Sequence, residues 1–203
     1  MDQCLGHSAG NALEVHEAIG VLTGVRKDPR LHEVTLALAT ELLLMAGLAA
    51  DAADARQRAE RALDSGAAAE RFARMIAALG GPHDLLERPA RHLAACAVQR
   101  PVHLPRAGTI GRIDVRALGL AIIALGGGRT NPADAIDHAV GLSEVQGPGE
   151  RVDAERPFAI VHARTEAELE AAARAFEAAV TVAEEAPMRR NEVIIETVEP
   201  SDR

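Results

Sequence analysis

The spacing of apolar residues predicts a run of helices over roughly the first ninety residues of the chain. In the first helix, Val15 and Ile19 fall on one face, and Asn11 precedes them at the place where a capping side chain is expected. The second helix is expected to begin at the cap Asp28, and the third, which is polar and rich in arginine, at Asp51.

A fourth helix carries an apolar stripe from Phe72 to Leu79. Glycine follows each of the four, as expected where a helix ends in the left-handed conformation that glycine adopts without strain. The four predicted helix ends lie at Gly24, Gly47, Gly66 and Gly80.

The pattern changes near residue 88, where prolines become frequent and residues 89–100 are predicted to form a linker. Beyond it, short alternating or continuous apolar runs predict strands, and two stretches of helical spacing predict helices. The strands are expected at residues 101–104, 109–115, 158–163 and 192–198, and the helices at 116–125 and 166–180. Strands interrupted by two helices are typical of the α+β class.

Composition and charge exclude several classes of protein. The chain is 48% hydrophobic and 26% charged, as in ordinary globular domains. Its net charge of −8 and its 1% aromatic content argue against nucleic-acid binding, which needs a basic face and stacking side chains.

The most apolar stretch, residues 42–50, is too short to cross a bilayer, and no signal-peptide pattern opens the sequence. Cys4 and Cys96 lie far apart and outside any metal-binding spacing, so we expect them to be free thiols. These features together predict a soluble cytoplasmic protein without a membrane partner.

Two motifs invite a chemical interpretation. The run Gly126-Gly127-Gly128-Arg129 could cradle a phosphate, but it follows a predicted helix and lacks the Lys-Ser/Thr of a P-loop, so we favour a helix end. Asp134, Asp137 and His138 could form a proton relay, although support of the turn near Pro132 is the interpretation that we favour for Asp134. No motif of metalloproteases or serine hydrolases is present, so chemistry alone assigns no activity.

Several segments, in a fixed order, resemble the thymidine phosphorylase and pyrimidine-nucleoside phosphorylase family. Residues 5–18 resemble a segment found midway along those enzymes, and the likeness extends over essentially the whole chain. Cys4 stands where the family usually has proline, and Asp2 where asparagine is common. The further matching segments are residues 28–31, 71–72, 75–82, 106–108, 125–129, 134–141 and 149–152.

The resemblance implies phosphate-dependent cleavage of the N-glycosidic bond of a pyrimidine nucleoside, which gives the free base and (deoxy)ribose 1-phosphate. It also implies that this chain corresponds to the C-terminal half of such an enzyme. The residues that hold phosphate and base lie in the N-terminal half, so no catalytic residue is expected here and the chain is expected to be inactive alone. Two alternatives are a non-catalytic module that acts beside a separately encoded N-terminal half, and a decayed or mis-started gene. The preference for thymidine or uridine is left open.

One binding site carries over from the resemblance. The resemblance implies that a monovalent cation, potassium, is held by the backbone carbonyls of Leu5 and Ser8 and by the carboxylate of Glu17. Hard oxygen donors suit such an ion. The alternative is that Glu17 is a solvated carboxylate on a helix surface.

The resemblance also implies a domain organisation. Residues 1–88 would be the helical remainder of the phosphorylase α/β domain, and residues 101–203 a hammerhead-like mixed β domain with flanking helices. We expect Leu42, Leu43, Leu44 and Met45 to expose apolar surface, because the sheet that these helices would cover is largely missing. The family is homodimeric through a helical lobe that is mostly absent here, so dimerisation is not carried over to this chain.

Overall fold

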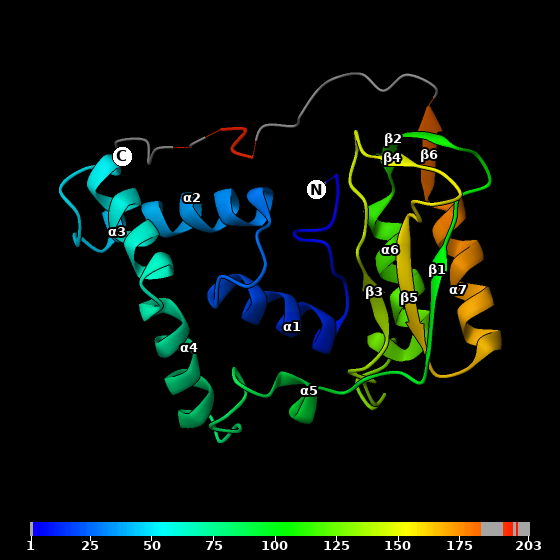
Figure 1. Cartoon of the computed structure of the whole chain (residues 1–203), viewed down its shortest axis with the longest axis horizontal. Coiled ribbons are helices and arrows are strands. Elements are labelled where there is room, and N and C mark those ends of the chain that lie inside the picture. The colour runs from blue at the N-terminus through cyan, green and yellow to red at the C-terminus, as the bar shows by residue number, and fades with distance from the viewer. Residues whose placement is uncertain (1, 184–192, 197, 199–203) are drawn as a thin grey trace.

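The computed structural model describes residues 2–183, 193–196 and 198, and it divides into a helical half and a half that contains strands (Figure 1). The predicted helices are present, and the α+β class is confirmed. Of the four helices in the first ninety residues, the last three lie together on one side of the molecule, the strands lie on the other side, and the first helix lies between them. The four are α1 (Asn11–Leu22), α2 (Pro29–Met45), α3 (Ala52–Asp64) and α4 (Ala67–Ala78).

Short acidic side chains start α2 and α3 as the sequence predicts. Asp28 Oδ1 accepts hydrogen bonds from the backbone N–H groups of Arg30 and Leu31, at 2.9 and 3.0 Å. Asp51 accepts one from the N–H group of Asp54 at 2.8 Å. The predicted helix ends are confirmed by positive φ angles at Gly24, Gly47, Gly66 and Gly80.

The start of α1 differs from the prediction, because Gly10 and not Asn11 holds the cap position, and no side chain caps the first turn. The backbones of Ala9 and Leu142 exchange two hydrogen bonds, of 3.0 and 2.8 Å. The two segments approach so closely that a Cβ atom on Gly10 would lie 2.5 Å from the carbonyl oxygen of Val140. The contact with the strand half therefore sets where α1 begins.

The predicted linker contains a short helix, α5 (Pro89–His92), and the beginning of a strand, β1 (Val98–Val102). β1 starts before the predicted range 101–104. Among the described strands, β1 pairs with β5 alone and so lies at the edge of its sheet. A proline such as Pro101 is tolerated there, because no ladder hydrogen bond is lost on the open side.

The strands form two small sheets, one in the order β1-β5-β3 and the other in the order β4-β2-β6. Every pairing between the described strands is antiparallel. The remaining strands are β2 (Gly108–Ile113), β3 (Gly141–Ser143), β4 (Arg151–Val152), β5 (Ala159–Ala163) and β6 (Val180–Ala183).

Two helices accompany the sheets, α6 (Val115–Ile122) and α7 (Glu166–Ala178). α6 ends in a π-helical turn, η1 (Ile123–Gly127), where Gly126 has a φ of 95°, so the predicted helix end at the glycine run is confirmed. α7 begins with a capping box, in which Thr165 and Glu168 each accept a backbone hydrogen bond from the other.

The predicted strands 109–115 and 158–163 are confirmed as β2 and β5 with small shifts at their ends. The predicted helix 166–180 stops earlier, because its last residues begin β6. The predicted strand 192–198 lies partly outside the described residues, and residues 193–196 and 198 form no strand. Strands β3, β4 and β6 were not predicted, since two to four residues are too few to show a period.

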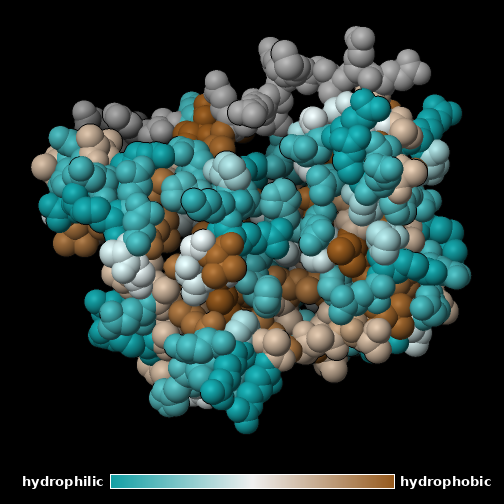
Figure 2. Space-filling model, viewed as in Figure 1, coloured by the Kyte–Doolittle hydropathy of each residue, from teal (hydrophilic) through white to brown (hydrophobic). Residues whose placement is uncertain are grey.

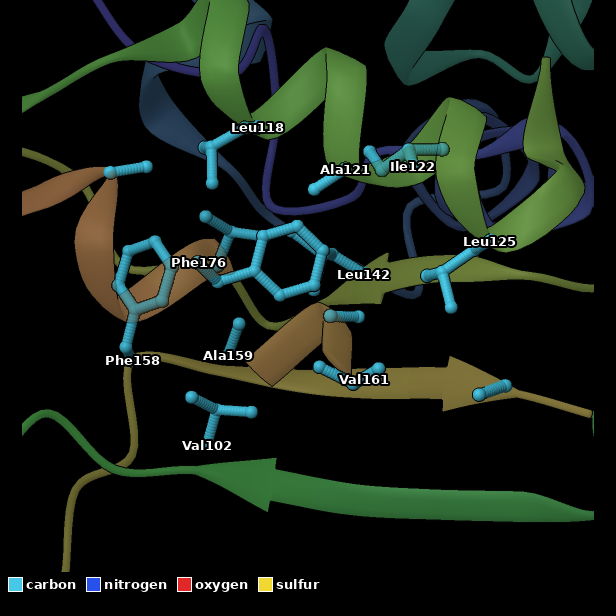
Figure 3. Close-up of a cluster of buried hydrophobic side chains, with 14 of the residues drawn as sticks. Val102, Leu118, Ala121, Ile122, Leu125, Leu142, Phe158, Ala159, Val161 and Phe176 are labelled. Carbon is cyan, nitrogen blue, oxygen red and sulfur yellow. The ribbon is translucent and has the colours of Figure 1, made fainter. Parts of the chain in front are cut away.

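The core lies between the sheet β1-β5-β3 and the helices α6 and α7 (Figure 3). Phe158 and Phe176, two of the three phenylalanines of the chain, are fully buried there. Aliphatic residues from both sheets and both helices surround them, and their burial supplies most of the hydrophobic stabilisation of this half. Among these are Val102, Leu118, Ile122, Leu125, Leu142 and Val161.

The helical half buries fewer apolar side chains than the half that contains strands. Leu36 is fully buried, whereas Leu42 and Met45 on the same helix are 65% and 83% exposed. The expected exposure is therefore confirmed for these two residues, while Leu43 and Leu44 are half-buried. Figure 2 shows apolar side chains at the surface between α1 and α4. Other exposed apolar residues of this half are Leu38, Leu48, Met75 and Leu79.

In the part of the chain that the structure describes, no helix combines the length and the apolar character needed to cross a bilayer.

Two leucines of α6 test where the core lies. Leu118 is 2% exposed and Leu120 is 56% exposed. We expect Leu118→Ala to lower the free energy of unfolding by about 2–5 kcal/mol, because it leaves a cavity beside Phe176 and its neighbours. Leu120→Ala, on the same helix, is the matched control and should change it by less than about 1 kcal/mol. Urea unfolding measures both, and equal losses would contradict this placement of the core.

Candidate functional site

The N-terminal loop, residues 2–10, joins the two halves of the molecule. Beyond the Ala9–Leu142 contact, the backbone N–H of Val145 donates to the carbonyl of His7 at 2.9 Å, and that of Ala12 donates to the carbonyl of His138 at 3.0 Å. A cavity of about 490 Å³ lies between this loop, the start of α2 and the loop 145–150. Leu5, Gly6 and His7 line it on one side, and Val145, Gly147 and Glu150 on the other.

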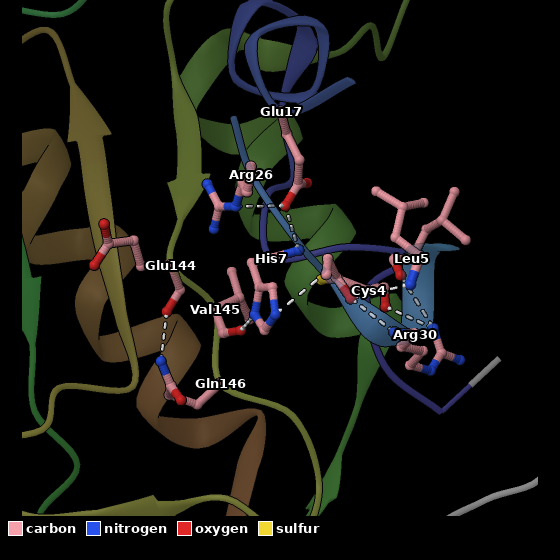
Figure 4. A network of polar contacts seen from close by, with 11 residues as sticks. Cys4, Leu5, His7, Glu17, Arg26, Arg30, Glu144, Val145 and Gln146 are labelled. Atoms are coloured by element: carbon pink, nitrogen blue, oxygen red, sulfur yellow. Dashed lines mark hydrogen bonds and ion pairs between the residues drawn. The ribbon is translucent and has the colours of Figure 1, made fainter. Parts of the chain in front are cut away.

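Glu17 lies at the centre of a polar network beside this loop (Figure 4). Only 4% of the residue is exposed. Its Oε1 accepts a hydrogen bond from the backbone N–H of His7 at 2.9 Å and lies 3.7 Å from Nε of Arg26. Glu17 is therefore not the solvated surface carboxylate of the alternative interpretation.

The other two predicted ligands lie on the same loop. Ser8 is 4% exposed, whereas Leu5 is 49% exposed. The Leu5 carbonyl accepts a hydrogen bond from Nη1 of Arg30 at 3.1 Å. A Cβ atom on Gly6 would lie 2.5 Å from Oε2 of Glu17, so the loop wraps closely around the carboxylate.

His7 connects this network to both halves. Its Nδ1 lies 2.9 Å from the carbonyl oxygen of Val145, and its Nε2 lies 3.4 Å from Oδ2 of Asp28. Asp28 is 4% exposed and also caps α2. No role was predicted for Arg26, which lies outside the matching segments, or for His7, which lies within residues 5–18, because only the folded loop brings them to Glu17.

The glycine run at residues 126–128 is not arranged as a phosphate loop. The next backbone N–H groups, of Thr130 and Asn131, donate to Oδ2 of Asp134 at 3.0 and 2.8 Å, and the Thr130 hydroxyl donates to the same oxygen. An internal carboxylate thus occupies the position of an anion. These hydrogen bonds lower the pKa of Asp134, and they confirm its predicted role in supporting a turn.

The proposed proton relay is not assembled. Asp137 accepts a hydrogen bond from the N–H group of Ala139 and pairs with Arg164 at 3.5 Å, while His138 is exposed. The Arg164 guanidinium also donates to the carbonyl of Leu125, which ties the connection between β5 and α7 to the turn η1. These groups therefore act in structure and not in proton transfer.

The fold brings together one pair that the sequence did not suggest. Oγ of Ser143 in β3 and Nε2 of His162 in β5 lie 2.8 Å apart. Among the described residues, no carboxylate pairs with His162, so the arrangement lacks the acid of a catalytic triad. Side chains alternate between the two faces of a strand, so the sequence could have indicated which face of β5 carries His162. It could not indicate Ser143 as the neighbour, because strand β3 was not predicted.

The two cysteines are free thiols, as expected, with Cys96 buried and Cys4 half-buried. Burial raises the pKa of each thiol, which makes the reactive thiolate scarce. Within residues 2–183, 193–196 and 198, no group of three His, Cys, Asp or Glu side chains could hold a metal ion.

Comparison with known proteins extends the likeness over most of the chain. Residues 1–69 match the family model described as "Glycosyl transferase family, a/b domain", and residues 109–183 match "Pyrimidine nucleoside phosphorylase C-terminal domain". The thymidine phosphorylase of Burkholderia cenocepacia (strain HI2424) is 60% identical over 178 residues, which cover 88% of this chain. That of Burkholderia lata is 59% identical over 164 residues, or 81% of the chain. The chain belongs to the thymidine/pyrimidine-nucleoside phosphorylase family.

The chain spans only part of these relatives. The matched residues make up 40% of the length of the Burkholderia cenocepacia phosphorylase and 37% of the Burkholderia lata phosphorylase. The two family models match in the same order along the chain as the helical and strand halves of the structure.

The oxygen atoms of Leu5, Ser8 and Glu17 in this phosphorylase-family chain are of the chemical type that binds monovalent cations. Carbonyl and carboxylate oxygens are hard donors, and Glu17 lies against the backbone between Leu5 and Ser8. The charge of Glu17 is already balanced by Arg26, however, and the Leu5 carbonyl already accepts a hydrogen bond from Arg30. A cation at this position would therefore meet two guanidinium groups.

The Ser143–His162 pair gives a pH-dependent prediction. Burial lowers the pKa of His162 below the value of about 6.5 in an unfolded chain, so folding favours the neutral ring. We expect the free energy of unfolding to fall as the pH drops from about 7.5 to about 5, because the unfolded state then binds more protons. In His162→Gln this loss should be smaller, as measured by urea unfolding at several pH values.

The control for this experiment is His16→Gln, because His16 is exposed on α1. It should keep the pH dependence of the unmodified chain. If His162→Gln also kept that dependence in full, the His162 ring would not be the group that folding holds neutral.

Proposed function

We propose that this chain is the C-terminal part of an enzyme that cleaves the N-glycosidic bond of pyrimidine nucleosides with inorganic phosphate. Such an enzyme is a pentosyltransferase. The two family models and the 60% identity to a thymidine phosphorylase support the reaction class. The reaction belongs to relatives of which this chain spans 40%, and the chain is proposed to take part in it only with further polypeptide.

The polar groups of the described residues support inactivity of the chain by itself. Phosphorolysis needs cationic or N–H donors that hold a phosphate dianion against the sugar. The single lysine, Lys27, is exposed, and the N–H groups after the glycine run are taken by Asp134. In the wall of the cavity, Arg30 is engaged with backbone carbonyls, while Glu33 and Glu150 would repel an anion.

The observation that carries the proposal is the exposed apolar face of the helical half. Leu38 and Leu42 on α2 are 58% and 65% exposed, and Leu79, which follows the last residue of α4, is 78% exposed. Leu38 and Leu42 are four residues apart and therefore lie on one face of α2, and soluble proteins rarely leave an apolar helix face exposed without a partner. We propose that polypeptide equivalent to the preceding part of the relatives covers this face and supplies the phosphate and nucleoside ligands.

We also propose that Leu5, Ser8 and Glu17 form one side of a monovalent cation site in the assembled enzyme. The geometry of the loop supports this role, because Glu17 and Ser8 are both buried and the backbone of residues 6 and 7 lies against the Glu17 carboxylate. The remaining oxygen donors would come from the covering polypeptide.

A complementation experiment tests the proposed function. Purified chain, incubated with thymidine and phosphate, should release no thymine above a blank. Addition of the part of the Burkholderia cenocepacia phosphorylase that precedes the matched region should restore release, because the missing ligands then meet this chain. Base release followed by chromatography measures both.

Leu42→Glu should abolish complementation, because it places a charge in the covered face. Leu120→Glu, in α6 and 56% exposed, is the matched control and should complement normally. Thymine release by the chain alone, after removal of host phosphorylase, would overturn the proposal of inactivity. Binding of the added part without any turnover would favour the alternative of a non-catalytic structural module.

A further inference from the structure

Arg26 reaches Glu17 by a route that the fold prepares. The backbone N–H of Arg26 donates to the carbonyl of Gly20 at 2.9 Å, which turns the loop after α1 back over the helix. A Cβ atom on Gly20 would lie 3.1 Å from Cβ of Arg26, so the arginine stem crosses α1 at the residue that has no side chain. Glu17 and Gly20 are three residues apart and therefore lie on one face of α1.

The contact between Arg26 and Glu17 balances a buried negative charge. Glu17 is buried, and a buried carboxylate without a positive partner is costly. The guanidinium of Arg26 is the only cationic side chain within 4 Å of Glu17 among the described residues. It stands 3.7 Å from Oε1, and its side chain is 36% exposed, so it can turn into water without breaking the core.

We propose that Arg26 is the resident counter-ion of Glu17 and competes with a monovalent cation for that carboxylate. This inference rests on the proposed cation site. A potassium ion bound to Glu17 and a guanidinium at the same oxygen would repel each other across a few ångströms. The ion therefore binds only when Arg26 leaves, and the folded chain needs no bound cation to balance Glu17.

The competition predicts a salt-specific stability for one variant. The full chain should have the same Tm in potassium chloride and in choline chloride at equal ionic strength. Arg26→Gln should lower the Tm in choline chloride by about 2–4 °C, because Glu17 loses its partner. Potassium chloride should restore this loss in a saturable manner, while Arg26→Lys, which keeps the charge, should stay close to the unmodified chain.

Two further variants complete the test. In the double variant Glu17→Gln/Arg26→Gln the potassium response should vanish, because no carboxylate is left to bind the ion. Arg58→Gln, which removes a surface ion pair with Asp54 on α3, controls for loss of an arginine and should show no potassium response.

The Tm values distinguish the role of Arg26 as counter-ion from its competition with potassium. An unchanged Tm of Arg26→Gln in choline chloride would overturn the role of Arg26 as counter-ion. A Tm of Arg26→Gln that is lowered by the same amount in potassium chloride and in choline chloride would overturn the competition. Neither result bears on thymine release by the complemented enzyme, which tests the proposed function on its own.

Discussion

Two backbone hydrogen bonds between Ala9 and Leu142 hold the helical half against the strand half. They require a very close approach of two backbone segments, since a Cβ atom on Gly141 would lie 2.2 Å from the carbonyl oxygen of Ala9. Glycine at positions 10 and 141 makes this approach possible. The direction of α1, the position of His7 and the shape of the cavity all follow from this contact.

The two halves are held by different means. The strand half has a continuous core around Phe158 and Phe176, whereas the helices are joined to one another mostly through small residues such as Ala55 and Ala59. Ion pairs, including the bidentate contact of Arg56 with Glu33, add to the helical half at its surface, where each is worth little. The apolar stripes of α2 and α4 are thus available for association with another polypeptide.

The sequence predicted what local chemistry decides and missed what distant contacts decide. Helices α2 and α3 were predicted with their caps, because Asp28 and Asp51 act on neighbouring N–H groups. Strands β3 and β4 were missed, because a strand of two or three residues exists only through its pairing. The same holds for the candidate site. Oxygen donors could be named from the resemblance, but the burial of Glu17 and its pairing with Arg26 depend on a loop that folds back over Gly20.

The loop after the glycine run shows how a structure can make itself indifferent to a ligand that its sequence suggests. Asp134 is joined to Asn131 by only two intervening residues, so its carboxylate is present at the Thr130 and Asn131 amides at an effective concentration of at least about millimolar. A free anion has to displace this tethered competitor and also leave it without its three donors. The amides of Thr130 and Asn131 are therefore already saturated within the chain, and an anion gains them only by leaving the Asp134 carboxylate without these hydrogen bonds.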